Sequence, residues 1–238
     1  MANFNIDIKE VLEVVNKEGL YKVDNFLNED ETSNLKTEML SCFEGVSTGE
    51  ELCFPNDREM SYPFGKICRV QNPDMVHFPN MRSIFSNLWF SNLTDNYFRC
   101  PNYKMLQVFF SHEFLTPSSV EGVTRNSVLH VDPYEAFKFM IYVTDCNEDS
   151  GAFRYIKGSH IDGNTIRKNN TTQGLLGDKY RLDANPELMD KYSEDDVTYA
   201  EAPAGSLLIF TTDLVHGGGI IKEEGLERLG IICHNRRI

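Results

Sequence analysis

The sequence predicts an α+β fold in which helices of the first part of the chain back an antiparallel β-barrel or sandwich. Helical periodicity dominates residues 1–100, whereas short apolar segments separated by turn residues dominate residues 101–238. The chain has 238 residues, 41% of them hydrophobic and 25% charged, as expected for a globular protein. Because no repeat or linker divides it, we expect one domain over residues 1–238, with 1–100 supporting a barrel core at 101–238.

Three amphipathic segments predict the helices. Asn28 is a candidate N-cap, and the three carboxylates that follow it favour a helix N-terminus. Residues 44–79 contain four prolines and are expected to be irregular, apart from a short strand near 66–70. The expected helices span residues 6–17, 28–43 and 80–90.

Apolar segments bounded by turn residues predict the strands. The polar residues 161–199 lie between two of them and are expected to be an insertion with one or two short helices near 186–192. The expected strands span residues 20–27, 103–110, 137–144, 152–156, 206–211 and 228–236.

Charge and cysteine content exclude several classes of function. The formal net charge is −13 and no basic run exceeds Arg236–Arg237, so we expect neither nucleic acid nor an anionic membrane as a partner. The six cysteines form no C-x-x-C pair, which argues against a zinc cluster or a disulfide framework. With no signal peptide and no apolar run of about 18 residues, we expect a cytoplasmic protein. The expected oligomeric state is a monomer or homodimer.

The segment 127–133 places His130 and Asp132 two residues apart in an apolar run that ends at Pro133. In a strand these two side chains would project from the same face. His216, which follows a later strand, is the best candidate for a third ligand. Two histidines and one carboxylate form the facial triad of non-haem Fe(II) oxygenases. A His-x-Asp pattern is common by chance, but the order of the elements that follow favours a metal site.

Arg228 opens an apolar strand twelve positions after His216. A buried cation is costly unless it is paired. One interpretation is a salt bridge to Glu224 or Glu227. The other is a bidentate clamp on the carboxylate of a co-substrate, for which the planar guanidinium is suited.

Together these motifs give the chain a family resemblance. It resembles the phytanoyl-CoA dioxygenase-like branch of the Fe(II)/2-oxoglutarate-dependent oxygenases. The matching features, in chain order, are Gly19–Leu27 with the helix after it, His130-Val-Asp132, Glu148–His160, Pro203–Phe210, His216 and Arg228.

The resemblance implies a double-stranded β-helix, the jelly-roll or cupin-like barrel, and a set of roles. His130, Asp132 and His216 would bind Fe(II), and Arg228 and Gln107 would contact 2-oxoglutarate, with O2 as the second co-substrate. Family members often carry a hydroxyl residue two positions after the distal histidine, where this chain has Gly218.

The implied reaction is hydroxylation, or another oxidation, of an unactivated C–H bond of a small-molecule metabolite or natural-product intermediate, with succinate and CO2 as co-products. Related halogenases lack the carboxylate, so Asp132 favours hydroxylation. Two alternatives stay open: a non-catalytic metal- or ligand-binding β-barrel protein, and a cupin-type dioxygenase that does not use 2-oxoglutarate. The motifs do not specify the substrate, whose pocket we expect the loops 44–79, 117–125 and 161–199 to line.

Overall fold

The computed structural model describes residues 2–48, 60–62, 65–70, 78–101, 103–114, 128–172 and 185–237. The α-helices are α1 (Ile8–Glu18), α2 (Glu29–Thr48), α3 (Pro79–Phe85), α4 (Leu88–Phe98), α5 (His160–Thr172) and α6 (Pro186–Met189), and a 3-10 helix, η4, spans Glu194–Asp196. The strands are β1 (Leu20–Val23), β2 (Met60–Tyr62), β3 (Gly65–Val70), β4 (Tyr103–Phe114), β5 (Ala136–Tyr142), β6 (Arg154–Ile156), β7 (Val197–Tyr199), β8 (Leu207–Thr211), β9 (His216–Gly217) and β10 (Glu227–Arg237).

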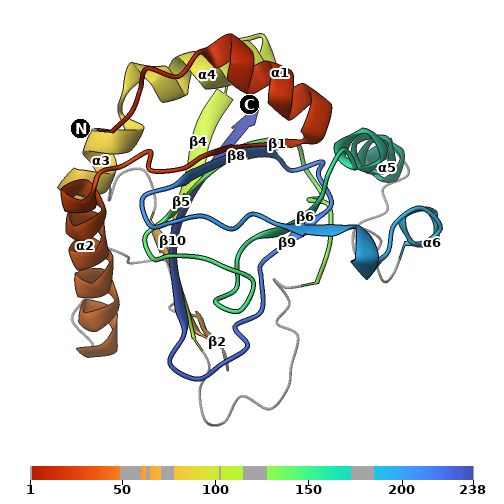
Figure 1. Ribbon diagram of the computed structural model, residues 1–238. Helices are drawn as coiled ribbons and strands as arrows, with labels where there is room; N and C mark the ends of the chain where they lie inside the picture. The colour runs from red at the N-terminus through yellow and green to blue at the C-terminus, as the bar shows by residue number, and fades with distance from the viewer. Residues whose placement is uncertain are drawn as a thin grey trace.

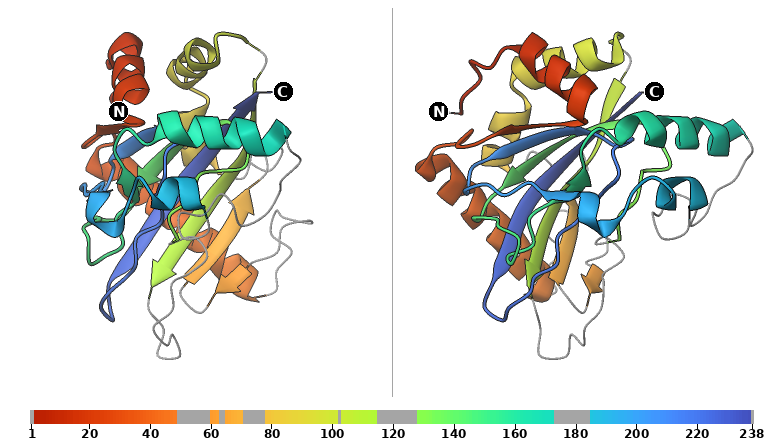
Figure 2. Two further views of the ribbon diagram at one scale, coloured as in Figure 1. Left: turned by 90° about the vertical axis from the view of Figure 1, so that its right-hand side faces the viewer. Right: turned by 45° about the vertical axis from the view of Figure 1, so that its right-hand side comes forward.

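The strands form two antiparallel sheets. The larger has seven strands in the order β1-β8-β5-β10-β4-β3-β2, and the smaller has three in the order β7-β6-β9. The N-terminal helices lie on one side of the large sheet, and the small sheet lies on the other side with α5 and α6 (Figures 1 and 2). The predicted α+β fold, with antiparallel sheets backed by N-terminal helices, is confirmed.

Strand β5 shows why the central strands read as nearly continuous apolar runs. Phe137, Phe139 and Ile141 pack into the cluster that includes the N-terminal helices. Met140 and Tyr142 point the other way, into the cluster between the two sheets. Because both faces of the large sheet are covered, all seven residues of β5 are buried, and the half-polar alternation of a surface strand is absent.

The structure corrects three sequence-based boundaries. The helix expected over 80–90 is two helices, because Asn87 caps a new one by accepting a hydrogen bond from the backbone N–H of Trp89. The strand expected over 20–27 ends at Val23. The expected insertion 161–199 ends in β7, which pairs with β6 and so belongs to the small sheet.

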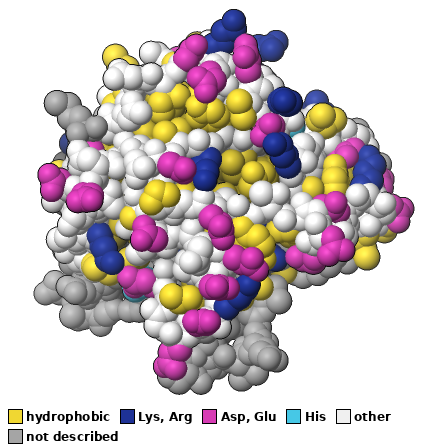
Figure 3. All heavy atoms as spheres, in the orientation of Figure 1, with side chains coloured by type: hydrophobic (Ala, Val, Ile, Leu, Met, Phe, Trp, Pro, Cys, Tyr) yellow, Lys and Arg dark blue, Asp and Glu magenta, His cyan; other side chains and the backbone are white. Residues whose placement is uncertain are grey.

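Charged side chains of both signs lie on the surface. On the face shown in Figure 3, Lys and Arg side chains are scattered among carboxylates, and the described residues form no continuous basic patch there. Within the described ranges, no helix has both the length and the apolar character needed to cross a bilayer.

Candidate metal centre

Two backbone segments bring the three predicted ligands together. His130 and His216 form an isolated antiparallel bridge, in which each backbone N–H donates to the carbonyl of the other at 2.8 Å. The N–H of Asp132 donates to the carbonyl of Thr212 at 3.0 Å. The His-x-Asp segment therefore runs beside residues 212–216, and its position is fixed by main-chain hydrogen bonds.

In the predicted strand 127–133, the described residues form one isolated β-bridge and no continuous strand, yet their side chains alternate as in a strand. Leu129 and Val131 are buried in an apolar cluster with Val215 and Ile156. His130 and Asp132 point to the opposite side. Burial of the alternate apolar residues therefore sets the direction of the ligands.

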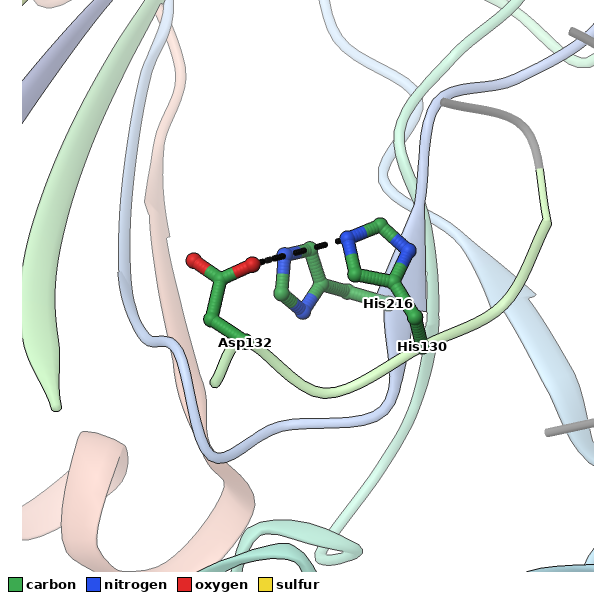
Figure 4. A group of neighbouring side chains, drawn as sticks. All are labelled: His130, Asp132 and His216. Atoms are coloured by element: carbon green, nitrogen blue, oxygen red, sulfur yellow. Dashed lines mark ion pairs between the residues drawn. The ribbon is translucent and has the colours of Figure 1, made fainter. Parts of the chain in front are cut away.

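The three side chains point toward one another (Figure 4). Asp132 Oδ1 lies 3.5 Å from His130 Nε2 and 3.9 Å from His216 Nε2, and one ligand atom from each residue falls within 4.8 Å of the others. His130 Nδ1 lies 2.7 Å from the carbonyl of Val128, and His216 Nδ1 lies 2.6 Å from that of Leu214. Each carbonyl accepts the Nδ1 proton, which leaves both Nε2 lone pairs facing the carboxylate.

The protonation states suit a metal site. Burial, together with the neighbouring His130, lowers the pKa of His216 to about 3, so its imidazole is neutral at neutral pH. Burial alone would raise the pKa of Asp132, but Lys138 and the two histidines outweigh it and hold this pKa well below its usual value. Metal ligands must be deprotonated, and His216 and Asp132 are deprotonated at neutral pH without a bound metal.

Aromatic rings pack against the site. The ring of Phe153 lies 5.6 Å from that of His216, and the ring of Phe210 lies 5.5 Å from it. Both phenylalanines are buried in the cluster between the sheets. They limit access of water to His216 from that side.

Sequence reasoning missed Lys138, whose Nζ lies 2.6 Å from Asp132 Oδ2. It is a single cation within the apolar strand β5, six positions after Asp132. An isolated charge in an apolar strand is the sequence signal by which Lys138 could have been found.

Arg228 is buried and paired. It forms an ion pair with Glu113 and donates a hydrogen bond to the carbonyl of Gly151. Arg228 thus forms a salt bridge, as one interpretation of the sequence expected, but its partner is Glu113 and not Glu224 or Glu227. The reason is that β10 pairs with β4 in a register that sets Arg228 opposite Glu113. Arg228 Nε is a buried donor with no hydrogen-bond partner among the described residues.

The remaining predicted site residue is Gln107. It lies in β4 opposite His234, and its side chain is outside the described part of the structure. His160 is separate from the triad: its Nε2 lies 3.0 Å from the carbonyl of Asn16, as expected of a residue that fixes a turn.

Several solved structures share this fold. The carbocyclase SnoK from nogalamycin biosynthesis has a TM-score of 0.65 and 13% identity, over 99% of this chain and 85% of SnoK. The epimerase SnoN, in complex with Fe3+, alpha ketoglutarate and nogalamycin RO, has a TM-score of 0.63 and 12% identity, over 97% of this chain and 83% of SnoN. HygX from Streptomyces hygroscopicus, with nickel and 2-oxoglutarate bound, has a TM-score of 0.58 and 13% identity, over 96% of this chain and 87% of HygX.

The comparison with curated proteins gives no match. The model of the phytanoyl-CoA dioxygenase family, in contrast, matches residues 15–225, most of the chain. This protein therefore belongs to the phytanoyl-CoA dioxygenase family.

Proposed function

We propose that this protein is an Fe(II)- and 2-oxoglutarate-dependent oxygenase that acts on a small molecule. The observation that carries the proposal is the His130–Asp132–His216 group, in which two imidazole Nε2 atoms and one carboxylate oxygen converge. Two histidines and one carboxylate are the donor set that non-haem Fe(II) oxygenases use. Family membership and the metal- and 2-oxoglutarate-bound relatives support the same assignment.

Each residue has a proposed role. His130 Nε2, His216 Nε2 and Asp132 Oδ1 would hold the iron. Arg228 would hold the far carboxylate of 2-oxoglutarate, for which its unpartnered Nε is an available donor, and Gln107 would contact the same co-substrate. When bound, iron, 2-oxoglutarate and O2 supply a coupled oxidation that converts 2-oxoglutarate to succinate and CO2 while a substrate C–H bond is oxidised.

The chain prepares the site for this chemistry. The carbonyls of Val128 and Leu214 keep the Nδ1 protons, so neither imidazole can rotate without losing a hydrogen bond. Phe153 and Phe210 shield His216 from water, which strengthens electrostatic interactions in the site.

For the reaction outcome we propose hydroxylation of an unactivated C–H bond. The presence of Asp132 supports it, because the carboxylate occupies the ligand position that related halogenases leave for halide. SnoN is an epimerase and SnoK a carbocyclase, so relatives with this fold carry out other reactions too. A metabolite or natural-product intermediate is the proposed substrate class.

The test is iron-dependent turnover of 2-oxoglutarate. Anaerobic addition of Fe(II) and 2-oxoglutarate should produce an absorbance band, and admission of O2 should yield succinate. His216→Ala should abolish both, whereas His112→Ala, which alters a histidine beside Glu227 outside the triad, should retain both. The proposal fails if the iron-loaded protein shows neither the band nor any succinate.

Arg228 separates the proposal from its alternatives. Arg228→Lys keeps a cation beside Glu113 but loses the planar fork, so 2-oxoglutarate affinity should fall while iron binding persists. Unchanged O2 consumption without any need for 2-oxoglutarate would favour a cupin-type dioxygenase. Iron binding without turnover of any co-substrate would favour a non-catalytic binding protein.

A further inference from the structure

Lys138 is the one buried lysine among the residues whose burial the structure describes, with 8% of the whole residue exposed. It lies on β5 between Phe137 and Phe139, which face the N-terminal helices, so it points toward the space between the sheets. Its Nζ sits 5.8 Å from the ring centre of Phe210. Burying an ammonium is unfavourable unless a partner compensates it, so this lysine needs a specific contact.

That contact is one oxygen of Asp132. Lys138 Nζ lies 2.6 Å from Oδ2, whereas it is Oδ1 that faces the two imidazoles, at 3.5 and 3.9 Å. The two oxygens of the same carboxylate thus have different partners. The side chains of Asp132 and Lys138 are each 10% exposed, so water competes little for either oxygen.

We propose that Lys138 is a positioning residue that makes Asp132 a one-oxygen metal ligand. The inference rests on the proposed function of the triad. The ammonium holds Oδ2 by an ion pair, no other described residue donates a hydrogen bond to that oxygen, and Oδ1 is the oxygen presented beside the histidines. Coordination by both oxygens would require Oδ2 to leave Lys138, and it would also use a metal position that the co-substrate or O2 needs.

Lys138 has a second, opposite effect on the site. Its positive charge repels a metal cation, so a lysine that acted only through its charge would weaken metal binding. A lysine that orients the carboxylate strengthens it. Removal of the ammonium should therefore strengthen metal binding if charge repulsion dominates and weaken it if positioning dominates, so a measurement of metal affinity tests the positioning role.

The experiment measures Ni(II) affinity by calorimetry without 2-oxoglutarate. Lys138→Met, similar in length but uncharged, should weaken Ni(II) binding about 10- to 100-fold, the usual range for residues that support metal ligands. Lys138→Arg should keep most of the affinity. The control is Lys36→Met, which removes a surface partner of Glu227 and should leave affinity unchanged. Equal or tighter binding in Lys138→Met overturns the proposal, as does a loss confined to 2-oxoglutarate affinity.

A measurement on the unaltered protein covers the case in which Lys138→Met does not fold. In a crystal structure with Ni(II), Asp132 should bind through Oδ1 only, with Lys138 still on Oδ2. Binding through both oxygens, or a Lys138 that has left the carboxylate, would refute the positioning role. The absence of Ni(II) binding by the unaltered protein would instead refute the proposed function, so the two failures are distinguishable.

Discussion

Asp213 joins helix α5 to the segment that carries His216, and its removal should destabilise the protein strongly. Its side chain is 6% exposed and lies three residues before His216. Arg167 Nε donates to Oδ1 at 2.5 Å, and Asn164 Nδ2 donates to Oδ2 at 2.6 Å. Both donors come from α5, so the carboxylate holds this helix against the turn before β9.

The size of the effect follows from burial. The side chain of Arg167 is 12% exposed, so Asp213→Ala would remove the carboxylate of an ion pair that lies in a nearly dry environment. Breaking a buried ion pair from one side costs about 3–5 kcal/mol. At about 2–4 °C per kcal/mol for a chain of this size, Tm should fall by about 6–20 °C.

Urea unfolding of the metal-free protein measures this change. Glu13→Gln serves as a control, because Glu13 and Lys9 form an exposed pair that contributes less than about 1 kcal/mol. Arg167→Met, alone and combined with Asp213→Ala, completes a double-mutant cycle. If Asp213→Ala stays within about 1 kcal/mol of the unaltered protein, the buried pair does not hold α5 and the reasoning is wrong.

Three further predictions concern pH, thiol reactivity and packing. Burial lowers the pKa of His216 to about 3, whereas an unfolded histidine titrates near 6.5. The unfolded chain therefore gains the proton first as pH falls, and the metal-free protein should lose about 2 kcal/mol of unfolding free energy between pH 7 and pH 5, a loss that His216→Asn should reduce in urea titrations. Burial raises the pKa of the Cys146 thiol to about 12, so iodoacetamide at pH 8 should modify the partly exposed Cys100 and spare Cys146 in peptide mass spectra; equal labelling would contradict this. In α5, the Cβ of Gly163→Ala would lie 1.9 Å from the carbonyl oxygen of Asp213, a clash that costs about 1–3 kcal/mol or more, against a helix-propensity gain of about 1 kcal/mol, so thermal unfolding should show a lower Tm.

The elements that the sequence predicted well are those with a strong local pattern. Strands β5 and β8 are nearly continuous apolar runs, because both faces of the large sheet are covered there, and β10 is marked by its apolar residues between Leu229 and Cys233. The short strands β7 and β9 are defined only by pairing with β6, so no local pattern marks them. Helices α3 and α4 were predicted as one helix because apolar residues at helical spacing, Ile84, Phe85 and Leu88, lie on both sides of the cap residue Asn87.

The site residues, too, fall into those that the sequence predicts and those that depend on strand register. The order of His130, Asp132 and His216 along the chain allowed them to be grouped before any contact was known. The pairing of Arg228 with Glu113 depends on the register of β10 against β4, and a shift of one residue would place the two on opposite faces. Sequence alone does not set that register, so only the glutamates near Arg228 in the chain, Glu224 and Glu227, could be predicted as its partners.

Four charged groups described between the sheets suggest a last property of the site. Lys138 neutralises Asp132 and Arg228 neutralises Glu113, so these side chains sum to zero. A divalent metal alone would add two positive charges and 2-oxoglutarate alone two negative ones, whereas both together restore neutrality in a low-dielectric interior. Metal and 2-oxoglutarate should therefore each tighten binding of the other, by about 5- to 150-fold. Equilibrium dialysis with and without Ni(II) measures the coupling. Glutarate carries the same charge but lacks the keto group that chelates metal, so a smaller gain for glutarate isolates the electrostatic part, and no gain at all would show that charge balance does not govern the site.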